Sequence, residues 1–297
     1  MKKIILIFAI AALLVSGCVS PERQELQKRL TDLKQSVEAT FPLVENLEIA
    51  KNRLIGGFYT DPFFPNELIK KKKGQVADVK SKLLQAESNI NSIKAEVDSL
   101  KENKLLTENQ RKYINVLSES YKTYTLYLNT LNKMLADINN YLNFQSHYIK
   151  FYEIREDMYR HISSASIYVD ANEPEKAKPE LNKAKELIIK AEREINDAEK
   201  FIAFDFIKEW KNYMALHSKY IDAFAEAVNL TALKKYPAAN KKFKESSSYL
   251  AEAKISKPND AIVREQMAKI KLDVFELKDK VEYYLNNAQE IYKSLSS

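Results

Sequence analysis

Apolar residues recur at helical spacing along most of this chain, and the pattern is most regular in the first third. Between residues 26 and 54 the steps alternate between three and four, and Lys51 is the one polar gap. A second series runs from residue 69 to residue 100, with Lys72 as its one missing step. The first series is Leu26, Leu30, Leu33, Val37, Thr40, Val44, Leu47 and Leu54, and the second is Ile69, Val76, Val79, Leu83, Ala86, Ile90, Ile93, Val97 and Leu100.

Heptad spacing sustained over this length is typical of helices that pack along a seam. We therefore predict helices over residues 21–55 and 66–102, each roughly 50–57 Å long at about 1.5 Å per residue. Nearly equal lengths joined by a loop over residues 56–65 indicate an antiparallel hairpin.

The rest of the chain repeats this pattern in several further segments. Thr107, followed three residues later by Gln110, predicts the start of a third long helix through a capping box. Asn, Asp and Pro residues over 169–174 end it, because they disfavour a continuing helix. We place the main boundary there, which gives two expected subdomains over residues 19–171 and 172–297. The C-terminal segments carry their own seams, and the last helix is expected after residue 259.

Composition supports an all-α chain. There are only four glycines, none follows Gly74, and 30% of the residues are charged. Tight turns and phosphate-binding loops need glycine, so both are disfavoured over most of the chain. The expected fold is an all-α helical bundle of long antiparallel, coiled-coil-like helices.

The first eighteen residues have a different character. Two lysines precede an apolar run over residues 4–15, and the small residues 16 and 17 lead into Cys18. A charged start, an apolar middle and a small-residue exit are typical of a signal peptide. Because a cysteine follows directly, the segment resembles the lipobox of prokaryotic lipoprotein precursors.

That resemblance implies a diacylglyceryl group on Cys18 and cleavage between Gly17 and Cys18, with residues 1–17 discarded. Acyl chains would then hold the protein to a lipid bilayer on the extracytoplasmic side, either in a periplasm or at a cell surface. The alternative is an ordinary secreted protein whose cysteine stands near the cleavage site by chance.

Several classes of function are disfavoured by the residues present. Cys18 is the only cysteine, so the body has no internal disulfide, cysteine metal site or thiol nucleophile. The net charge is +6, or +4 without Lys2 and Lys3, which is low for a nucleic-acid-binding protein. No motif for a cofactor or for hydrolytic catalysis is present, so we expect no enzyme, no cofactor and no nucleic-acid partner.

The three histidines do not form an evident metal site. His147 lies about 21 Å along a straight helix from His161, too far for one metal ion to join them. Asp157 and His161 are four residues apart, and we expect an exposed pair on one helix face. His217 falls on an aromatic seam and is expected to pack there.

The loop over residues 56–65 is the strongest candidate for a partner-binding segment. It holds four aromatic residues, Phe58, Tyr59, Phe63 and Phe64. Four lysines follow the loop, namely Lys70, Lys71, Lys72 and Lys73. Either the aromatic side chains fold over the end of the bundle, or they form a docking tip for a protein partner of the cell envelope.

Tyrosine is abundant, with 17 residues, many between residues 113 and 168. Either these side chains fill the bundle seam, or some line a groove for a small molecule, peptide or glycan. We thus expect a non-catalytic interaction or scaffold lipoprotein, with a ligand-binding module as the alternative.

A faint internal similarity links two C-terminal segments. Ala177, Leu181, Ala184 and Ile188 recur 62 residues later as Ala239, Phe243, Ser246 and Leu250. The small–large–small spacing resembles the second helix of a tetratricopeptide unit. The period does not match two such units, and their Gly and Trp signature positions are missing.

Overall fold

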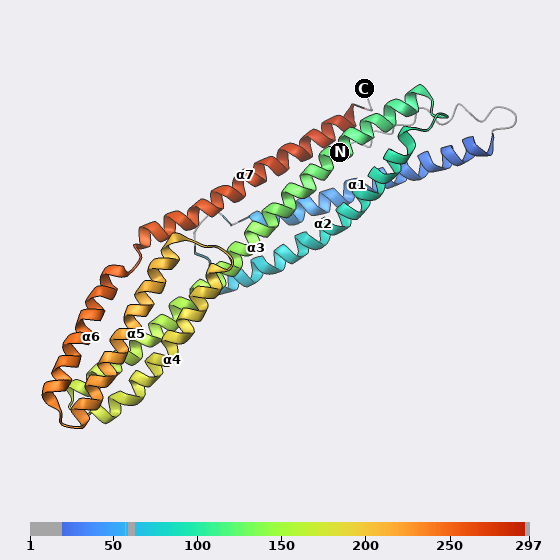
Figure 1. Cartoon of the computed structure of the whole chain (residues 1–297). Helices are drawn as coiled ribbons and strands as arrows, with labels where there is room; N and C mark the ends of the chain where they lie inside the picture. The colour runs from blue at the N-terminus through green and yellow to red at the C-terminus, as the bar shows by residue number, and fades with distance from the viewer. Residues whose placement is uncertain (1–19, 57, 59–62, 295–297) are drawn as a thin grey trace. The chain divides into compact units, whose positions relative to one another are not determined.

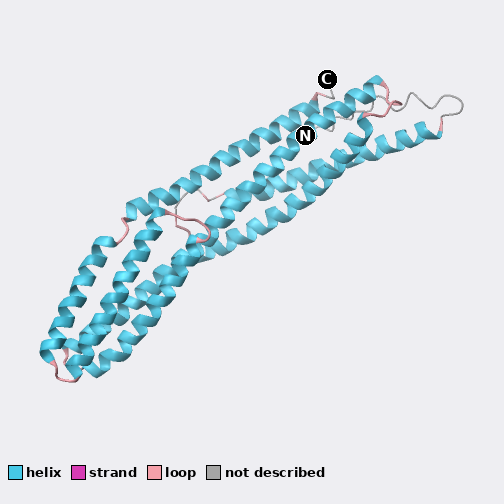
Figure 2. Ribbon diagram, viewed as in Figure 1, coloured by secondary structure: helices cyan, strands magenta, loops and turns pink. Residues whose placement is uncertain are grey.

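The computed structural model describes residues 20–56, 58 and 63–294 (Figure 1). Within them the regular structure is entirely α-helical, with loops and turns between the helices (Figure 2). The helices are α1 (Pro21–Ile55), α2 (Asn66–Lys101), α3 (Glu108–Asp170), α4 (Pro174–Glu199), α5 (Asp205–Ala232), α6 (Tyr236–Ser256) and α7 (Asp260–Lys293). The expected fold class, an all-α helical bundle, is confirmed.

Local capping chemistry explains where several helices begin. Ser20 precedes α1, and its side chain accepts a hydrogen bond from the Arg23 amide. Before α3, the Thr107 hydroxyl accepts from the Gln110 amide at 3.3 Å, while the Gln110 side chain accepts from the Thr107 amide at 2.9 Å. The predicted capping box is therefore present. α4 begins at Pro174, where a missing amide proton leaves no helical bond unmade.

The two seams predicted for α1 and α2 are buried. Apart from the half-buried Leu30, every residue of both series is shielded from solvent. The two polar gaps are buried as well, with Lys51 at 0% and Lys72 at 2% exposure. Seam position therefore decides burial even where the residue is a lysine.

The chain divides into two compact units, each built from segments that are distant in sequence. The first unit comprises Met1–Gly57, Gln75–Ala136 and Val274–Ser297. Within it, Arg29 pairs with Glu96 at 2.7 Å, and Thr40 bonds to Asn89 at 2.7 Å. As residue numbers rise along α1, the numbers of their partners on α2 fall. These two helices therefore run antiparallel in this unit.

The second unit comprises Phe58–Gly74 and Asp137–Asp273. α4 folds back along the C-terminal part of α3, because His147 contacts Glu194 and His161 contacts Glu180. α5 packs against both α4 and α6. The boundary expected after residue 171 falls at the turn between α3 and α4, inside this unit. A helix break at that point is a turn within one packed unit, because α4 returns onto α3.

No helix in the described ranges has the length and apolarity that crossing a bilayer requires. Gly17 and Cys18, with the rest of the predicted signal peptide, lie outside the described residues.

Candidate functional site

Two aromatic residues of the 56–65 loop belong to the core of the second unit. Phe58 is 1% exposed and Phe64 is 2% exposed. Their rings contact each other at 5.3 Å between centroids, and the Phe58 ring lies 5.8 Å from that of Tyr141. The Phe64 amide donates to the Gln145 side chain at 2.8 Å. These two side chains are packed as the folded-over alternative expects and present no exposed tip, whereas Tyr59 lies outside the described residues.

The four lysines do not form one exposed patch. They lie in the first turns of α2, where Lys70 and Lys71 are exposed, Lys73 is half-buried and Lys72 is 2% exposed. Burial lowers the pKa of Lys72 and of Lys73, with smaller effects from Lys71 and Lys150 respectively. Lys72 is buried because it occupies a seam position between apolar neighbours.

Phe63 is the aromatic residue of this loop that borders a cavity. It is half-buried, and its ring stacks on Tyr148 with centroids 6.1 Å apart and planes 15° apart. The guanidinium carbon of Arg264 lies 5.4 Å from the centre of the same ring. An aromatic ring with a cation over its face therefore borders the cavity.

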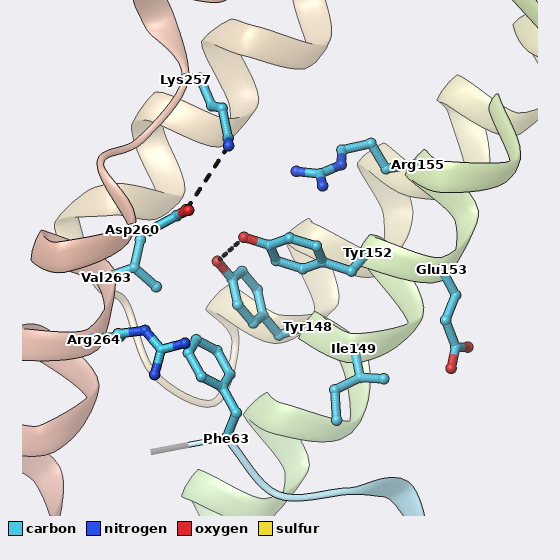
Figure 3. A pocket seen from close by; sticks show the side chains of 10 residues that line it. All are labelled: Phe63, Tyr148, Ile149, Tyr152, Glu153, Arg155, Lys257, Asp260, Val263 and Arg264. Atoms are coloured by element: carbon cyan, nitrogen blue, oxygen red, sulfur yellow. Dashed lines mark hydrogen bonds and ion pairs between the residues drawn. The ribbon is translucent and has the colours of Figure 1, made fainter. Parts of the chain in front are cut away.

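The cavity next to Phe63 has a volume of about 430 Å³ and lies wholly within the second unit (Figure 3). Its walls come from the 56–65 loop, α3, α7 and the connection before α7. The lining residues are Phe63, Tyr148, Ile149, Tyr152, Glu153, Arg155, Lys257, Asp260, Val263 and Arg264. This volume is in the range of small-molecule sites. The wall combines aromatic and aliphatic side chains with charged ones, namely Glu153, Arg155, Lys257, Asp260 and Arg264.

The tyrosine wall is held in place by a chain of hydrogen bonds. The Trp210 indole N–H donates to the Tyr148 hydroxyl at 2.9 Å. That hydroxyl donates in turn to the Tyr152 hydroxyl at 3.3 Å, and Figure 3 shows this second bond. Burial raises the pKa of Tyr148 and of Tyr152, so both hydroxyls stay protonated near neutral pH. They can donate or accept hydrogen bonds but carry no charge.

Arg155 is the most unusual residue of the cavity. It is 8% exposed, and its Nη2 donates to the Glu156 carboxylate at 2.9 Å. Its Nε and Nη1 have no hydrogen-bond acceptor in the part of the chain that the structure describes. The rings of Tyr152 and Trp210 lie 4.3 Å and 5.0 Å from the guanidinium carbon. Figure 3 shows the guanidinium directed into the cavity.

The other charged groups of the wall have protein partners. Lys257 and Asp260 form an ion pair at 3.9 Å, and Glu153 accepts a hydrogen bond from the Asn66 side chain at 3.2 Å. Arg264 lies over the Phe63 ring. Arg155 therefore differs from them in combining burial with N–H donors that lack an acceptor.

Beyond the cavity, His217 joins a second buried polar cluster. The His217 Nδ1–H donates to the Tyr213 carbonyl at 3.0 Å, which leaves Nε2 to accept from the Tyr159 hydroxyl at 2.7 Å. The hydroxyls of Tyr159 and Tyr213 also contact each other. Burial lowers the pKa of His217, the largest of its influences, and raises the pKa of Tyr213 to about 12. This packed position agrees with the expectation for His217.

The expected pair of Asp157 with His161 is wrong. Asp157 pairs with Arg160 at 2.7 Å, while His161 contacts Glu180 of α4 at 2.5 Å. Helical spacing allowed the first pairing, but α4 brings a carboxylate to His161 from a different element. In the described ranges, no group of three or more His, Cys, Asp and Glu residues is placed to hold a metal ion.

The cavity was only partly foreseeable from sequence. Tyr148 and Tyr152 belong to the tyrosine-rich stretch between residues 113 and 168, for which a ligand groove is one of the two expected alternatives. Arg155 was missed because an arginine on a charged helix resembles any solvated residue; its one local signal is the i,i+3 spacing from Tyr152. No protein-family model, curated protein or solved structure matches this chain.

Proposed function

We propose that this chain is a lipid-anchored, non-catalytic interaction protein of the cell envelope, and that it binds a small organic ligand in the cavity of its second unit. The observation that carries the proposal is the 430 Å³ cavity walled by Phe63, Tyr148 and Tyr152. Aromatic walls contribute apolar contact area, and hydroxyl groups add directional contacts.

Binding without catalysis fits the chemistry of the cavity wall. Its two carboxylates are Glu153 and Asp260, and each interacts with a neighbouring Asn or Lys side chain. Histidine, cysteine and serine do not occur among the lining residues of the described cavity. The groups present are suited to holding a ligand.

The cavity supports ligand binding more strongly than the loop supports a scaffold role. A docking tip needs aromatic side chains in solvent, yet Phe58 and Phe64 are buried. Phe63, the third described aromatic residue of the loop, stacks on Tyr148 and lines the cavity. The loop thus contributes a wall to the ligand site.

Anchoring through Cys18 is supported by the lipobox resemblance of the first eighteen residues. The test is radiolabelled palmitate incorporation in cells, followed by separation of membrane and soluble fractions. We expect label on the native chain and none on Cys18→Ser, with the variant leaving the membrane fraction or retaining an uncut signal. An unlabelled native chain would contradict the anchor while leaving the ligand proposal standing.

Ligand binding is tested by calorimetric titration of the full chain in nonionic detergent, with a micelle blank. Three flat probes of similar shape are used: 2-naphthoate, 2-naphthalenemethanol and 2-naphthylmethylamine. We expect one-to-one binding of at least one probe. Ile149→Trp, which adds an indole at the half-buried cavity wall, should abolish it.

The matched control is Ile167→Trp, on the same helix and 63% exposed. It should leave binding unchanged. Ligand binding at this cavity is refuted if no probe binds above the blank, or if Ile149→Trp and Ile167→Trp behave alike.

A further inference from the structure

We infer that the ligand carries a carboxylate, and that Arg155 is the residue that recognises it; this rests on the proposed ligand-binding function. The ligand class is then a flat, largely apolar organic acid, with its ring system along Phe63 and Tyr148 and its carboxylate at the guanidinium.

Arg155 is a charged side chain held out of water. An arginine side chain remains protonated under all physiological conditions, so its burial carries a full positive charge out of water. Buried charges are normally paired and hydrogen-bonded, because desolvation is strongly unfavourable. Here Nε and Nη1 have no acceptor in the described part of the chain, although the residue is only 8% exposed.

The guanidinium is partly surrounded by groups of the protein. Tyr152 and Trp210 cover it through cation–π contacts at 4.3 Å and 5.0 Å, which stabilise the charge through its faces. Ring faces accept no in-plane hydrogen bonds, so the edge donors need an oxygen. Glu156 supplies one to Nη2 and is 66% exposed at its side chain, which weakens its hold on the charge.

The cations of the wall indicate the charge of the ligand. Lys257 is paired with Asp260, and Arg264 is exposed to water, so Arg155 is the buried cation of the wall whose donors lack an acceptor in the described chain. One such cation matches a single negative charge. A carboxylate fits this arrangement better than a phosphate ester, which carries close to two charges at neutral pH.

The Arg155 guanidinium is directed toward the aromatic wall of the cavity. Figure 3 shows the guanidinium pointing into the same space that the Tyr148 and Tyr152 rings border. A ligand lying along those rings brings its end group to Arg155. The Tyr152 hydroxyl, kept protonated by burial, borders the same space and interacts with the Tyr148 hydroxyl and the Arg155 side chain.

The test compares the affinities of matched probes for the full chain in nonionic detergent. We expect 2-naphthoate to bind about tenfold more tightly than 2-naphthalenemethanol, as a charge-assisted hydrogen bond provides. In Arg155→Met the two affinities should agree within about twofold. Arg160→Met, an exposed arginine on the same helix, should keep the native preference.

Two further arms complete the experiment. Arg155→Lys keeps the charge, so it should retain part of the preference and show that loss in Arg155→Met is not a folding defect; helicity and melting of each variant are recorded alongside. 2-Naphthyl phosphate should bind no more tightly than 2-naphthoate, and a clear advantage for it would overturn the assignment of a carboxylate.

The outcomes separate the two proposals. Binding of the alcohol or amine probes without preference for 2-naphthoate refutes the carboxylate assignment and leaves the ligand site intact. A preference that survives in folded Arg155→Met refutes the role of Arg155. Absence of binding by every probe refutes the proposed function itself.

Discussion

Two buried cations, Lys51 in the first unit and Arg155 in the second, differ in how completely the protein pairs them. In the first unit, Lys51 is fully buried, and its ammonium meets the Glu48 carboxylate at 2.6 Å. The other Glu48 oxygen accepts from the Tyr127 hydroxyl at 2.8 Å, so the carboxylate is engaged on both sides. In the second unit, Arg155 keeps two nitrogen atoms without an acceptor in the described chain. The first arrangement is complete within the protein, whereas the second is completed by a ligand in our proposal.

The largest expected effect comes from breaking the complete arrangement. Glu48→Gln removes the anion that faces the buried Lys51 ammonium, and we expect a loss of about 3 kcal/mol in the free energy of unfolding. Urea denaturation followed by circular dichroism at 222 nm measures it. Adding Lys51→Met to Glu48→Gln should restore most of the lost free energy of unfolding. The side-chain amide introduced at position 48 still accepts a hydrogen bond from the Tyr127 hydroxyl, and the buried ammonium is gone. A double variant as unstable as the single one would contradict this account of Lys51.

A smaller effect is expected from the hydrogen-bond chain of the cavity wall. Tyr148→Phe leaves the buried Trp210 N–H without its acceptor and should lower the free energy of unfolding by about 1–2 kcal/mol. The control is Tyr283→Phe, where the ring is 62% exposed and little change is expected. Equal urea midpoints for the two variants would show that the chain contributes nothing to stability.

A pH effect is expected from His217, whose pKa is lowered chiefly by burial. In the unfolded chain its pKa is close to the ordinary value near 6.5, so below that pH the unfolded state binds more protons than the folded one. The stability contributed by neutral His217 is thus complete above about pH 6.5 and falls as pH drops toward the folded pKa.

The measurement is the urea midpoint at pH 7.5 and pH 5.5, followed by the fluorescence of Trp210, the single tryptophan of the chain. His217→Gln should reduce the difference between the two midpoints. An unchanged difference in that variant would assign the pH dependence to other groups.

The smallest effect on stability is expected from Arg155→Met. Removing an incompletely paired buried charge relieves its desolvation while losing ring contacts, so the free energy of unfolding should change by less than about 1 kcal/mol. The same urea titration measures it beside Glu48→Gln. If Arg155→Met lowered the free energy of unfolding by about 3 kcal/mol, Arg155 would stabilise the fold as Lys51 does. The contrast between the two residues would then be lost.

Sequence patterns predicted most of the helices because the information is local. The seam of α1 identified buried positions such as Val37 and Leu47, and the Thr107 capping box marked the start of α3. Such features depend on neighbours within a few turns. The partner of His161 could not be found this way, since Glu180 reaches it only through the packing of α4 on α3.

The candidate site could be predicted only in part for the same reason. Phe63, Arg155 and Arg264 are far apart in sequence, and tertiary packing alone brings them to one cavity. The loop over residues 56–65 shows a second limit of prediction from sequence. Its composition indicates that the rings avoid water, but it does not distinguish burial in the same chain, as found for Phe58 and Phe64, from burial against a partner.

The most direct test of the central claim is nuclear magnetic resonance of the Arg155 Nε–H group in the full chain, assigned by its loss in Arg155→Lys. We predict that 2-naphthoate shifts this resonance and slows its exchange with water, while 2-naphthalenemethanol leaves it nearly unchanged. An Arg155 resonance that does not respond while 2-naphthoate binds to the protein would contradict the account.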